Sequence, residues 1–341
     1  MYRYIGNKTK LLPVILGKIG SLVPQGSTVC DLMAGTGSVS YALRAKGYRV
    51  VASDVMTYSK CHLTKGLLFD KEPDFSGLGL KGYQGVLGYL NSLPPKCGYF
   101  YNEFAPDGKP ANGLPPRKYF TSSNAAKIDA IREQINQWEA EGSISQNECL
   151  VLKHTLILAA NSVANISGTY GYFLSSFKDS SKKEVSLEPE PFYPGRVDNV
   201  VLQGFAEDLS SAIVADLCYI DPPYMKRQYA ANYHILETLA RGDYPEAIGK
   251  SGLRNWWDQH SKFCTKTRIF DAFRKIFEGM RCPLFVISYS EDGLIEIGKL
   301  CSFFKEFGRV SLEEINYQRF RSNDSKLGKE LKEYLITVDR R

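Results

Sequence analysis

Residues 27–54 have the sequence STVCDLMAGTGSVSYALRAKGYRVVASD, and this stretch decides the fold that we expect. Its apolar pattern predicts a strand over 27–33, a helix over 37–47 and a second strand over 48–54. Two strands joined by one helix lie parallel in a sheet, because a parallel connection needs a crossover of about a dozen residues. The stretch therefore indicates an α/β protein with a mostly parallel sheet.

The loop between the first strand and the helix has features of a cofactor site. Gly35 and Gly37 let the backbone turn tightly and approach a ligand closely. A dinucleotide-binding loop would have a third glycine where this chain has Ser40, which weakens the case for NAD. Asp31 would suit a cationic or amine-bearing cofactor, and Asp54 can accept both hydroxyls of a ribose. This set favours S-adenosylmethionine, which has no phosphate to bind; a plain turn is the alternative.

A second stretch, YIDPPYMKRQYAANYH at residues 219–234, follows an apolar run. The run over 212–220 predicts a buried strand, which the two prolines stop abruptly. Asp221 and Tyr224 then stand in a rigid loop, and ligands of open α/β sheets bind at such strand ends. A strand-ending turn with an acidic helix cap is an alternative explanation of the same residues.

The rest of the chain completes a doubly wound sheet that is interrupted by an insertion. Residues 76–194 show helical and loop patterns but no strand pattern, so we expect them to form an inserted helical and loop region. The sheet domain would then comprise residues 1–75 and 195–341. Further strands are expected at 199–205, 283–290 and 333–338, and helices at 122–138 with a serine N-cap, 145–165, 226–241 and 294–307.

The composition is that of a globular protein. The 341 residues carry a formal net charge of +6, which permits a nucleic-acid partner without requiring one. Residues 249–281 hold eight Lys or Arg and three acids, so this segment would form either a groove for a phosphate backbone or a solvated helix face. The sequence shows no membrane span and no signal peptide, and its histidines and cysteines lack metal-ligand spacing. We expect a cytoplasmic protein with reduced thiols and no metal.

The order of these motifs resembles that of the Dam-like adenine-specific DNA methyltransferases. RYIGNK at residues 3–8 comes first, followed by the glycine loop, the ribose acid, the insertion and DPPY at 221–224. The longer string DPPYMKRQYAANYHILET at 221–238 is similar to the members that accompany restriction systems, of the FokI methyltransferase kind. The resemblance implies the doubly wound, Rossmann-like fold of the S-adenosylmethionine-dependent methyltransferases, with an insertion that recognises the target.

The resemblance implies a set of cofactor-binding residues. Met33 stands where the family usually has Phe, and Glu207 is the better match to the acid near the cofactor adenine, with Asp208 as its alternative. The implied residues are Tyr4, Lys8, Asp31, Met33, Gly35, Gly37, Asp54, Glu207 or Asp208, and Asp221.

The resemblance also implies a catalytic loop of Asp221, Pro222, Pro223 and Tyr224. The Asp221 carboxylate and the Pro222 carbonyl would accept the hydrogens of an adenine amine, and Tyr224 would stack on a base flipped out of the duplex. Further DNA contacts are expected, for some of which helix packing or a solvated helix start is an equal explanation. These are Asn165, Tyr170, Lys226, Arg227, Tyr229, Tyr233 and Arg254.

The activity implied is site-specific methyl transfer to adenine N6 in double-stranded DNA, within a restriction-modification system. The same fold could instead act on cytosine N4, on RNA or on a protein amide, or bind DNA without turnover. Target recognition would fall to residues 76–120 and 176–195, or alternatively to 249–270. We expect a monomer that forms no stable complex with the cognate restriction endonuclease.

Overall fold

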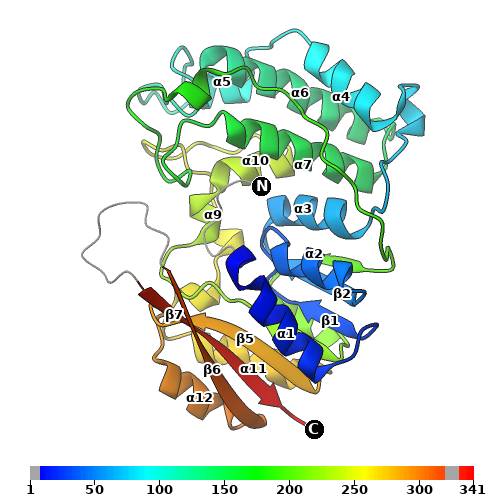
Figure 1. The fold of residues 1–341 in the computed structure, drawn as a ribbon. Helices are drawn as coiled ribbons and strands as arrows, with labels where there is room; N and C mark the ends of the chain where they lie inside the picture. The colour runs from blue at the N-terminus through cyan, green and yellow to red at the C-terminus, as the bar shows by residue number, and fades with distance from the viewer. Residues whose placement is uncertain (1–7, 319–329) are drawn as a thin grey trace. The chain divides into compact units, whose positions relative to one another are not determined.

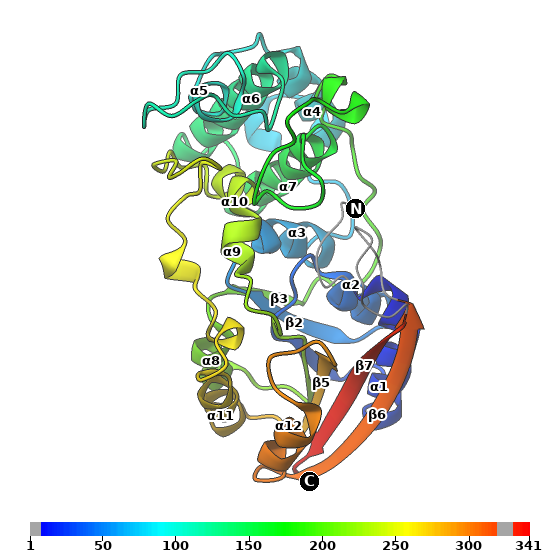
Figure 2. The same ribbon diagram turned by 90° about the vertical axis from the view of Figure 1, so that its left-hand side faces the viewer.

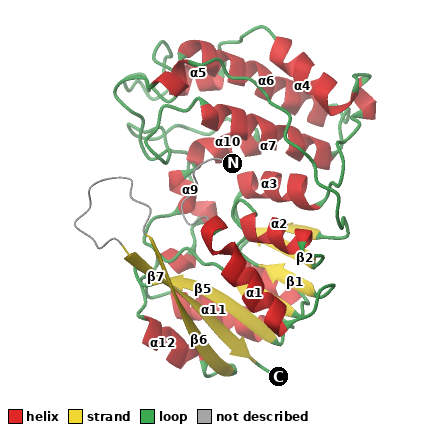
Figure 3. Cartoon of the chain, viewed as in Figure 1, coloured by secondary structure: helices red, strands yellow, loops and turns green. Residues whose placement is uncertain are grey.

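The chain folds into two compact units, which are described separately. The structure is a computed structural model that describes residues 8–318 and 330–341 (Figures 1 and 3). The first unit, called the sheet unit, contains the described part of residues 6–59, 195–228 and 259–341. The second unit, called the helical unit, contains residues 60–194 and 229–258.

The sheet unit is built on one sheet of seven described strands. Their order across the sheet is β3-β2-β1-β4-β5-β7-β6. The strands are β1 (Thr28–Asp31), β2 (Arg49–Asp54), β3 (Val200–Gln203), β4 (Leu217–Ile220), β5 (Leu284–Ser290), β6 (Arg309–Gln318) and β7 (Glu330–Asp339).

The sheet is doubly wound, as predicted. β1 pairs in parallel with β2 on one side and with β4 on the other. The pairs β2–β3 and β4–β5 are also parallel. The carboxyl ends of β1 and β4 therefore lie side by side where the strand order reverses. Ligands of open α/β sheets bind at such a point.

One edge of the sheet departs from the parallel arrangement. β7 runs antiparallel to both β5 and β6 and lies between them. Its register pairs Glu333 with Ser290 of β5. The last strand of the chain thus enters the interior of the sheet and brings a carboxylate with it.

Helices cover both faces of the sheet (Figure 2). On one side lie α1 (Leu12–Leu22) and α2 (Ser38–Ala45); on the other lie α8 (Ala206–Leu209), α11 (Ile269–Gly279) and α12 (Ile297–Phe304). Cys30 and Leu32 of the β1 region join the apolar core under α11 and α12. Asp31 faces the opposite way, toward α2, because successive side chains of a strand alternate between the two faces.

The helical unit contains helices and one isolated β-bridge, and no strand in its described residues. Helix α6 contacts both α5 and α7, and α7 contacts α10. Helix α3 (Thr57–Leu67) begins in the sheet unit and continues in this one. The other helices are α4 (Gly82–Ser92), α5 (Tyr99–Phe104), α6 (Ser122–Ala140), α7 (Gln146–Ser162), α9 (Tyr229–Asn232) and α10 (His234–Arg241).

Several elements differ from the sequence-based expectation. The N-cap of α6 is Thr121 rather than a serine, because the Thr121 hydroxyl accepts the amide N–H of Asn124. The helix expected over 226–241 starts at Tyr229 and is interrupted at Tyr233, which gives α9 and α10. The helical unit extends beyond the insertion expected at 76–194, because α10 packs against α7. The elements that the sequence did not predict individually include α1, α3, α4, α5, α8 and β6.

Candidate active site

The glycine loop connects the carboxyl end of β1 to α2 and contacts the carboxyl end of β2. Gly35 and Gly37 have φ angles of 54° and 82°, which side chains with a Cβ rarely adopt. The turn brings the amide nitrogen of Gly35 to 2.9 Å from Oδ2 of Asp54, while Oδ1 accepts the amide of Met56 at 2.8 Å. Asp54 is thereby fixed at the end of β2, beside the glycine loop.

Asp31 is the buried acid of the loop. Its Oδ2 accepts a hydrogen bond from the Ser40 hydroxyl of α2 at 2.6 Å. Burial raises the pKa of Asp31 to about 7, an effect that the Ser40 hydrogen bond opposes and the nearby Asp221 and Asp54 reinforce. A carboxylate in this environment gains from a cationic partner, because the partner offsets the cost of burying its charge.

Asp221 follows β4 and forms an ion pair with Lys8. The ammonium Nζ of Lys8 lies 3.2 Å from Oδ1 of Asp221 and 2.5 Å from Oε1 of Glu333. Burial alone would lower the pKa of Lys8, but the two carboxylates hold it well above its usual value. Burial raises the pKa of Asp221 to about 7, against the opposing effect of Lys8. The Asp221 side chain is 18% exposed, whereas those of Lys8 and Glu333 are 5% and 0% exposed. Asp221 is therefore the member of this group that a substrate can reach.

Tyr224 is held by the loop after β5. Its carbonyl accepts the amide of Leu294 at 3.0 Å, and its ring meets that of Tyr289 edge to face, with 5.9 Å between the centroids. The Lys8 ammonium lies 5.4 Å from the centroid of the Tyr224 ring. Pro222 is buried and Pro223 is partly buried. Contacts within the protein therefore hold Tyr224 of the DPPY loop in place.

Two further acids follow β3, in α8. Glu207 is buried and its Oε1 lies 3.0 Å from the ammonium of Lys262. Asp208 is exposed and pairs with Lys275. The carboxyl end of β3 lies at the same edge of the sheet as those of β2 and β1, so the buried Glu207 fits the role of an acid near the cofactor better than Asp208 does.

The remaining predicted cofactor residues are Tyr4 and Met33. Tyr4 lies outside the described residues. Met33 is partly buried and packs against the apolar core, beyond the end of β1. It therefore borders the glycine loop from the core side.

Asn165 and Tyr170 hold the inside of the helical unit together. The Asn165 amide donates to the carbonyls of Lys118 and Leu174, and the side chain is fully buried. The Tyr170 hydroxyl donates to Asn161, and that ring is fully buried too. These two side chains are buried and bonded internally, so they have no exposed surface that DNA could contact.

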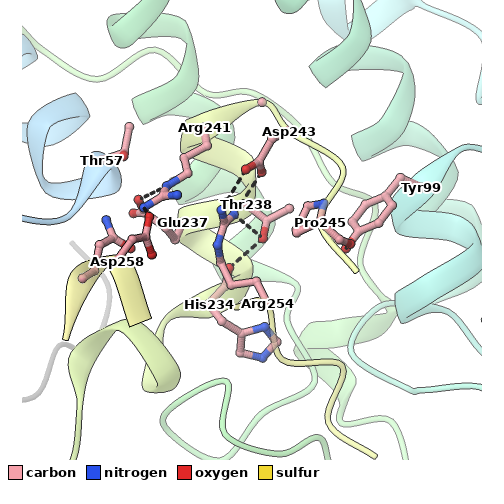
Figure 4. A network of polar contacts seen from close by, with 12 residues as sticks. Thr57, Tyr99, His234, Glu237, Thr238, Arg241, Asp243, Pro245, Arg254 and Asp258 are labelled. Atoms are coloured by element: carbon pink, nitrogen blue, oxygen red, sulfur yellow. Dashed lines mark hydrogen bonds and ion pairs between the residues drawn. The ribbon is translucent and has the colours of Figure 1, made fainter. Parts of the chain in front are cut away.

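Arg254 is likewise a structural residue of the helical unit (Figure 4). Its guanidinium makes two parallel bonds to the Asp243 carboxylate at 2.9 and 2.7 Å, and a third to the hydroxyl of Thr238 at 3.1 Å. Arg241 beside it pairs with Glu237 and Asp258, each at 2.8 Å. Arg254 is only 4% exposed, so it ties the segment after α10 to that helix rather than facing a phosphate.

The other expected DNA contacts differ in exposure. Tyr233 is buried and stacks on the partly buried Tyr229, as in helix packing. Lys226 and Arg227, directly after the DPPY loop, are exposed. Of the expected set, these two basic side chains have the surface position that a phosphate contact needs.

Sequence reasoning missed Glu333 and its neighbour Ser288. Ser288 of β5 donates its hydroxyl to Oε1 of Glu333 at 2.6 Å, the same oxygen that Lys8 approaches. The only sequence signal was an acid at the start of the apolar run EYLITV. An acid in such a run suggests a buried partner, but nothing in the run says which residue the partner is.

The acidic side chains around this edge of the sheet fit S-adenosylmethionine. The carboxylates of Asp31, Asp54, Asp221 and Glu333 outnumber the one ammonium among them, which suits a sulfonium and an amine. In the described ranges no group of three or more His, Cys, Asp or Glu is placed to hold a metal ion. Nor is any helix in the part of the chain described here both long and apolar enough to cross a membrane.

Comparisons with known proteins show sequence similarity to DNA methyltransferases along almost the whole chain. The type II methyltransferase M.NlaIII of Neisseria lactamica is 33% identical over 323 residues, which are 94% of this chain and 92% of that protein. M.CviAII of Paramecium bursaria Chlorella virus 1 is 32% identical over 98% of this chain and 97% of its own length. M.FokI of Planomicrobium okeanokoites is 32% identical over 99% of this chain, which spans 52% of that longer relative.

The family of this chain is shown by these relatives and by a match to the sequence model of a protein family. The sequence model of the D12 class N6 adenine-specific DNA methyltransferases matches residues 4–302. The match includes both the glycine loop and the DPPY loop, whose acids lie at the switch point of the sheet. This chain belongs to the D12 class of N6 adenine-specific DNA methyltransferases.

Proposed function

We propose that this protein transfers a methyl group from S-adenosylmethionine to the N6 amine of an adenine at a specific site in double-stranded DNA. The observation that carries the proposal is the Asp221 carboxylate. It follows β4 at the switch point and is paired with the buried Lys8, and its side chain is 18% exposed. An acid that is fixed but still accessible can receive the hydrogens of a substrate amine.

The cofactor would be held by the carboxyl edge of β1, β2 and β3. Asp31 would receive the amine of the methionine part, and Asp54 would receive the ribose hydroxyls. Gly35 and Gly37 would let the backbone approach closely, Glu207 would bind near the adenine, and Met33 would border the site. When bound, S-adenosylmethionine supplies an electrophilic methyl group on its sulfonium.

The DPPY loop would prepare the acceptor amine. The amine of adenine is a poor nucleophile because its lone pair is delocalised into the ring. The Asp221 carboxylate would accept one N–H and the Pro222 carbonyl the other, which favours a pyramidal nitrogen with a free lone pair. The methylated nitrogen must lose a proton, and an acid whose pKa is about 7 is well matched to accept it near neutral pH.

The target base would be flipped out of the duplex and stacked on Tyr224. Stacking on an aromatic ring is worth about 1–3 kcal/mol per base. Lys226 and Arg227 would contact the phosphates beside the flipped base. Target recognition would fall to loops of residues 76–120 and 176–195, or to the segment 249–270.

The wider setting is part of the same proposal. We assign the protein to a restriction-modification system because relatives such as M.NlaIII and M.FokI carry the name of type II methyltransferases. We expect it to act in the cytoplasm as a monomer, one base per encounter, without a stable complex to the cognate endonuclease.

The test is methyl transfer from labelled S-adenosylmethionine to unmethylated duplex DNA, with Asp221→Ala as the control. The DNA is digested and its nucleosides are identified by mass. N6-methyladenine that is lost in the variant is the expected result. N4-methylcytosine would retain the mechanism and change the base, whereas no methylated nucleoside despite cofactor binding would overturn the proposal in favour of RNA, a protein amide or a binding protein.

A further inference from the structure

Glu333 is a fully buried acid in an interior strand. Its side chain is 0% exposed, and a buried carboxylate is stable only when it is paired and hydrogen-bonded. Its Oε1 accepts two hydrogen bonds, from the Lys8 ammonium at 2.5 Å and from the Ser288 hydroxyl at 2.6 Å. Oε2 is buried and makes no hydrogen bond to the described residues. Among the described residues, Lys8 and Ser288 are therefore the two that orient the carboxylate.

Lys8 joins Glu333 to the catalytic loop. Its ammonium lies between Oε1 of Glu333 and Oδ1 of Asp221, so one cation serves two anions. A buried ion pair that only stabilised the fold would be neutral, whereas this cluster carries one net negative charge when all three groups are ionised. Excess charge that is buried beside a reactive acid is typical of functional sites.

Glu333 lies outside the part of the chain that the family model matches, which ends at residue 302. It reaches the site only because β7 enters the sheet between β5 and β6. We propose that Glu333 is a positioning residue for methyl transfer: it fixes the Lys8 ammonium beside Asp221 and sets the charge balance that makes Asp221 an effective proton acceptor. The inference rests on the proposed function.

The groups around Asp221 determine whether loss of the Glu333 charge raises or lowers the pKa of Asp221. Burial and the Glu333 charge raise the pKa of Asp221, and Lys8 lowers it. Asp31 also interacts with Asp221 by like-charge repulsion, and the hydroxyls of Tyr219 and Tyr224 interact with Lys8. Removing the Glu333 charge removes its repulsion of the Asp221 carboxylate, and the Lys8 ammonium then pairs with Asp221 alone. Both changes lower the pKa of Asp221 and make it a weaker base.

The experiment compares Glu333→Gln with wild type over a range of pH in the methyl-transfer assay. The amide keeps the size of the side chain and an oxygen for Ser288. We expect the maximal kcat to fall about tenfold and the acidic midpoint of the pH profile to move down by about one unit. The matched control is Glu314→Gln in β6. It removes an exposed ion pair with Lys332 of β7, and we expect neither kcat nor the midpoint to change.

A second variant separates charge from position. Ser288→Ala removes one hydroxyl that orients Glu333 but leaves its charge, so kcat should fall about threefold with an unchanged midpoint. The proposal is overturned if Glu333→Gln behaves like the control, or if it loses rate without any shift of the midpoint. Should Glu333→Gln fail to fold, Ser288→Ala decides alone, and a wild-type rate would overturn the proposal.

The same chain also offers a test that needs no turnover. If wild type methylates no nucleoside, the proposed function fails, and a double-mutant cycle of Lys8→Met and Glu333→Gln in unfolding by denaturant then tests the contact. Coupled residues are expected to lose less stability together than the sum of their separate losses. Additive losses would overturn the link between Lys8 and Glu333 whatever the protein methylates.

Discussion

The ring of Tyr224 meets the ring of Tyr289 edge to face, at 5.9 Å between centroids and 64° between planes. The contact depends on the loop that follows β5. There Gly293 lets the Tyr289 ring approach the backbone, and the next residue, Leu294, donates its amide to the Tyr224 carbonyl. Tyr224 of the DPPY loop is thus placed by the loop that follows β5.

Gly293→Ala should therefore impair the DPPY loop. The new Cβ would come within 2.2 Å of the Tyr289 ring, so ring and loop must separate. We expect kcat to fall at least about tenfold, because small displacements of a reacting group are costly. Steady-state rates check this, with Gly298→Ala as the control, where a Cβ meets nothing closer than 3.7 Å. Equal rates for the two variants would contradict the prediction.

Asp31→Asn should weaken cofactor binding. The variant keeps a hydrogen-bond acceptor for Ser40 but loses the charge that would face the methionine amine. Hydrogen bonds to charged groups contribute about 1.5–3 kcal/mol, so the Kd measured by calorimetry should rise about 10- to 100-fold. The exposed Asp208 provides the control, and Asp208→Asn should bind as wild type does. Wild-type affinity in Asp31→Asn would remove Asp31 from the site.

Arg254→Ala should destabilise the helical unit rather than abolish DNA binding. It breaks a partly buried bidentate pair with Asp243, at a cost of about 2–3 kcal/mol in the free energy of unfolding. Denaturant unfolding measures the loss. A folded variant that binds DNA many-fold more weakly in a direct titration would show instead that Arg254 reads DNA.

The pair Lys226→Ala and Arg227→Ala should show the opposite behaviour. Both side chains are exposed, so their removal should leave the unfolding midpoint nearly unchanged. If they neutralise two phosphates, the slope of log K against log salt should become less steep by about 1.8. Binding measured at several salt concentrations gives this slope, and an unaltered slope would exclude the two residues as phosphate contacts.

Acid should destabilise the helical unit through His234. Its Nε2 is 3.0 Å from the carbonyl of Tyr170 and must donate to it, while Nδ1 is buried without a hydrogen bond to the described residues. Burial lowers the pKa of His234 to about 3, from an ordinary 6.5. The unfolded chain therefore takes up a proton first, and stability falls by about 1.4 kcal/mol per pH unit below 6.5.

The measurement is the free energy of unfolding at pH 7 and pH 5. Wild type should lose about 2 kcal/mol more over this interval than His234→Gln, in which the buried amide cannot titrate. The other buried histidines, His62 and His154, contribute equally to both proteins and cancel in the comparison. Parallel losses would mean that folding does not lower the pKa of His234.

Local patterns predicted the core of this fold well. The alternation around Asp31 and the glycine turn are properties of adjacent residues, so the first βαβ unit and its acids were found from sequence. β6 was missed because the consecutive charged residues Glu313 and Glu314, both exposed, interrupt the apolar alternation of a strand. Pro13 at the start of α1 similarly interrupts an apolar run that would otherwise suggest a helix.

Long-range partners were beyond the reach of the sequence. Lys8 was predicted through a motif, but its contact with Glu333 arises only from the pairing of β7 with β5. The internal roles of Tyr170 and Arg254 depend in the same way on elements that meet in space. A motif can therefore suggest which polar residue matters without saying whether it faces a ligand or the interior.

The place of β7 in the sheet has a consequence for the order in which the molecule is made. Lys8 and Glu333 are 325 positions apart, so the carboxylate that completes the ammonium's surroundings leaves the ribosome long after the first strands have emerged. Contacts between such distant positions form late in folding. Until β7 pairs between β5 and β6, the growing chain holds Asp221 and Lys8 without the Glu333 carboxylate beside them. The charges around Asp221 are thus complete only after a strand far along the chain has joined the sheet.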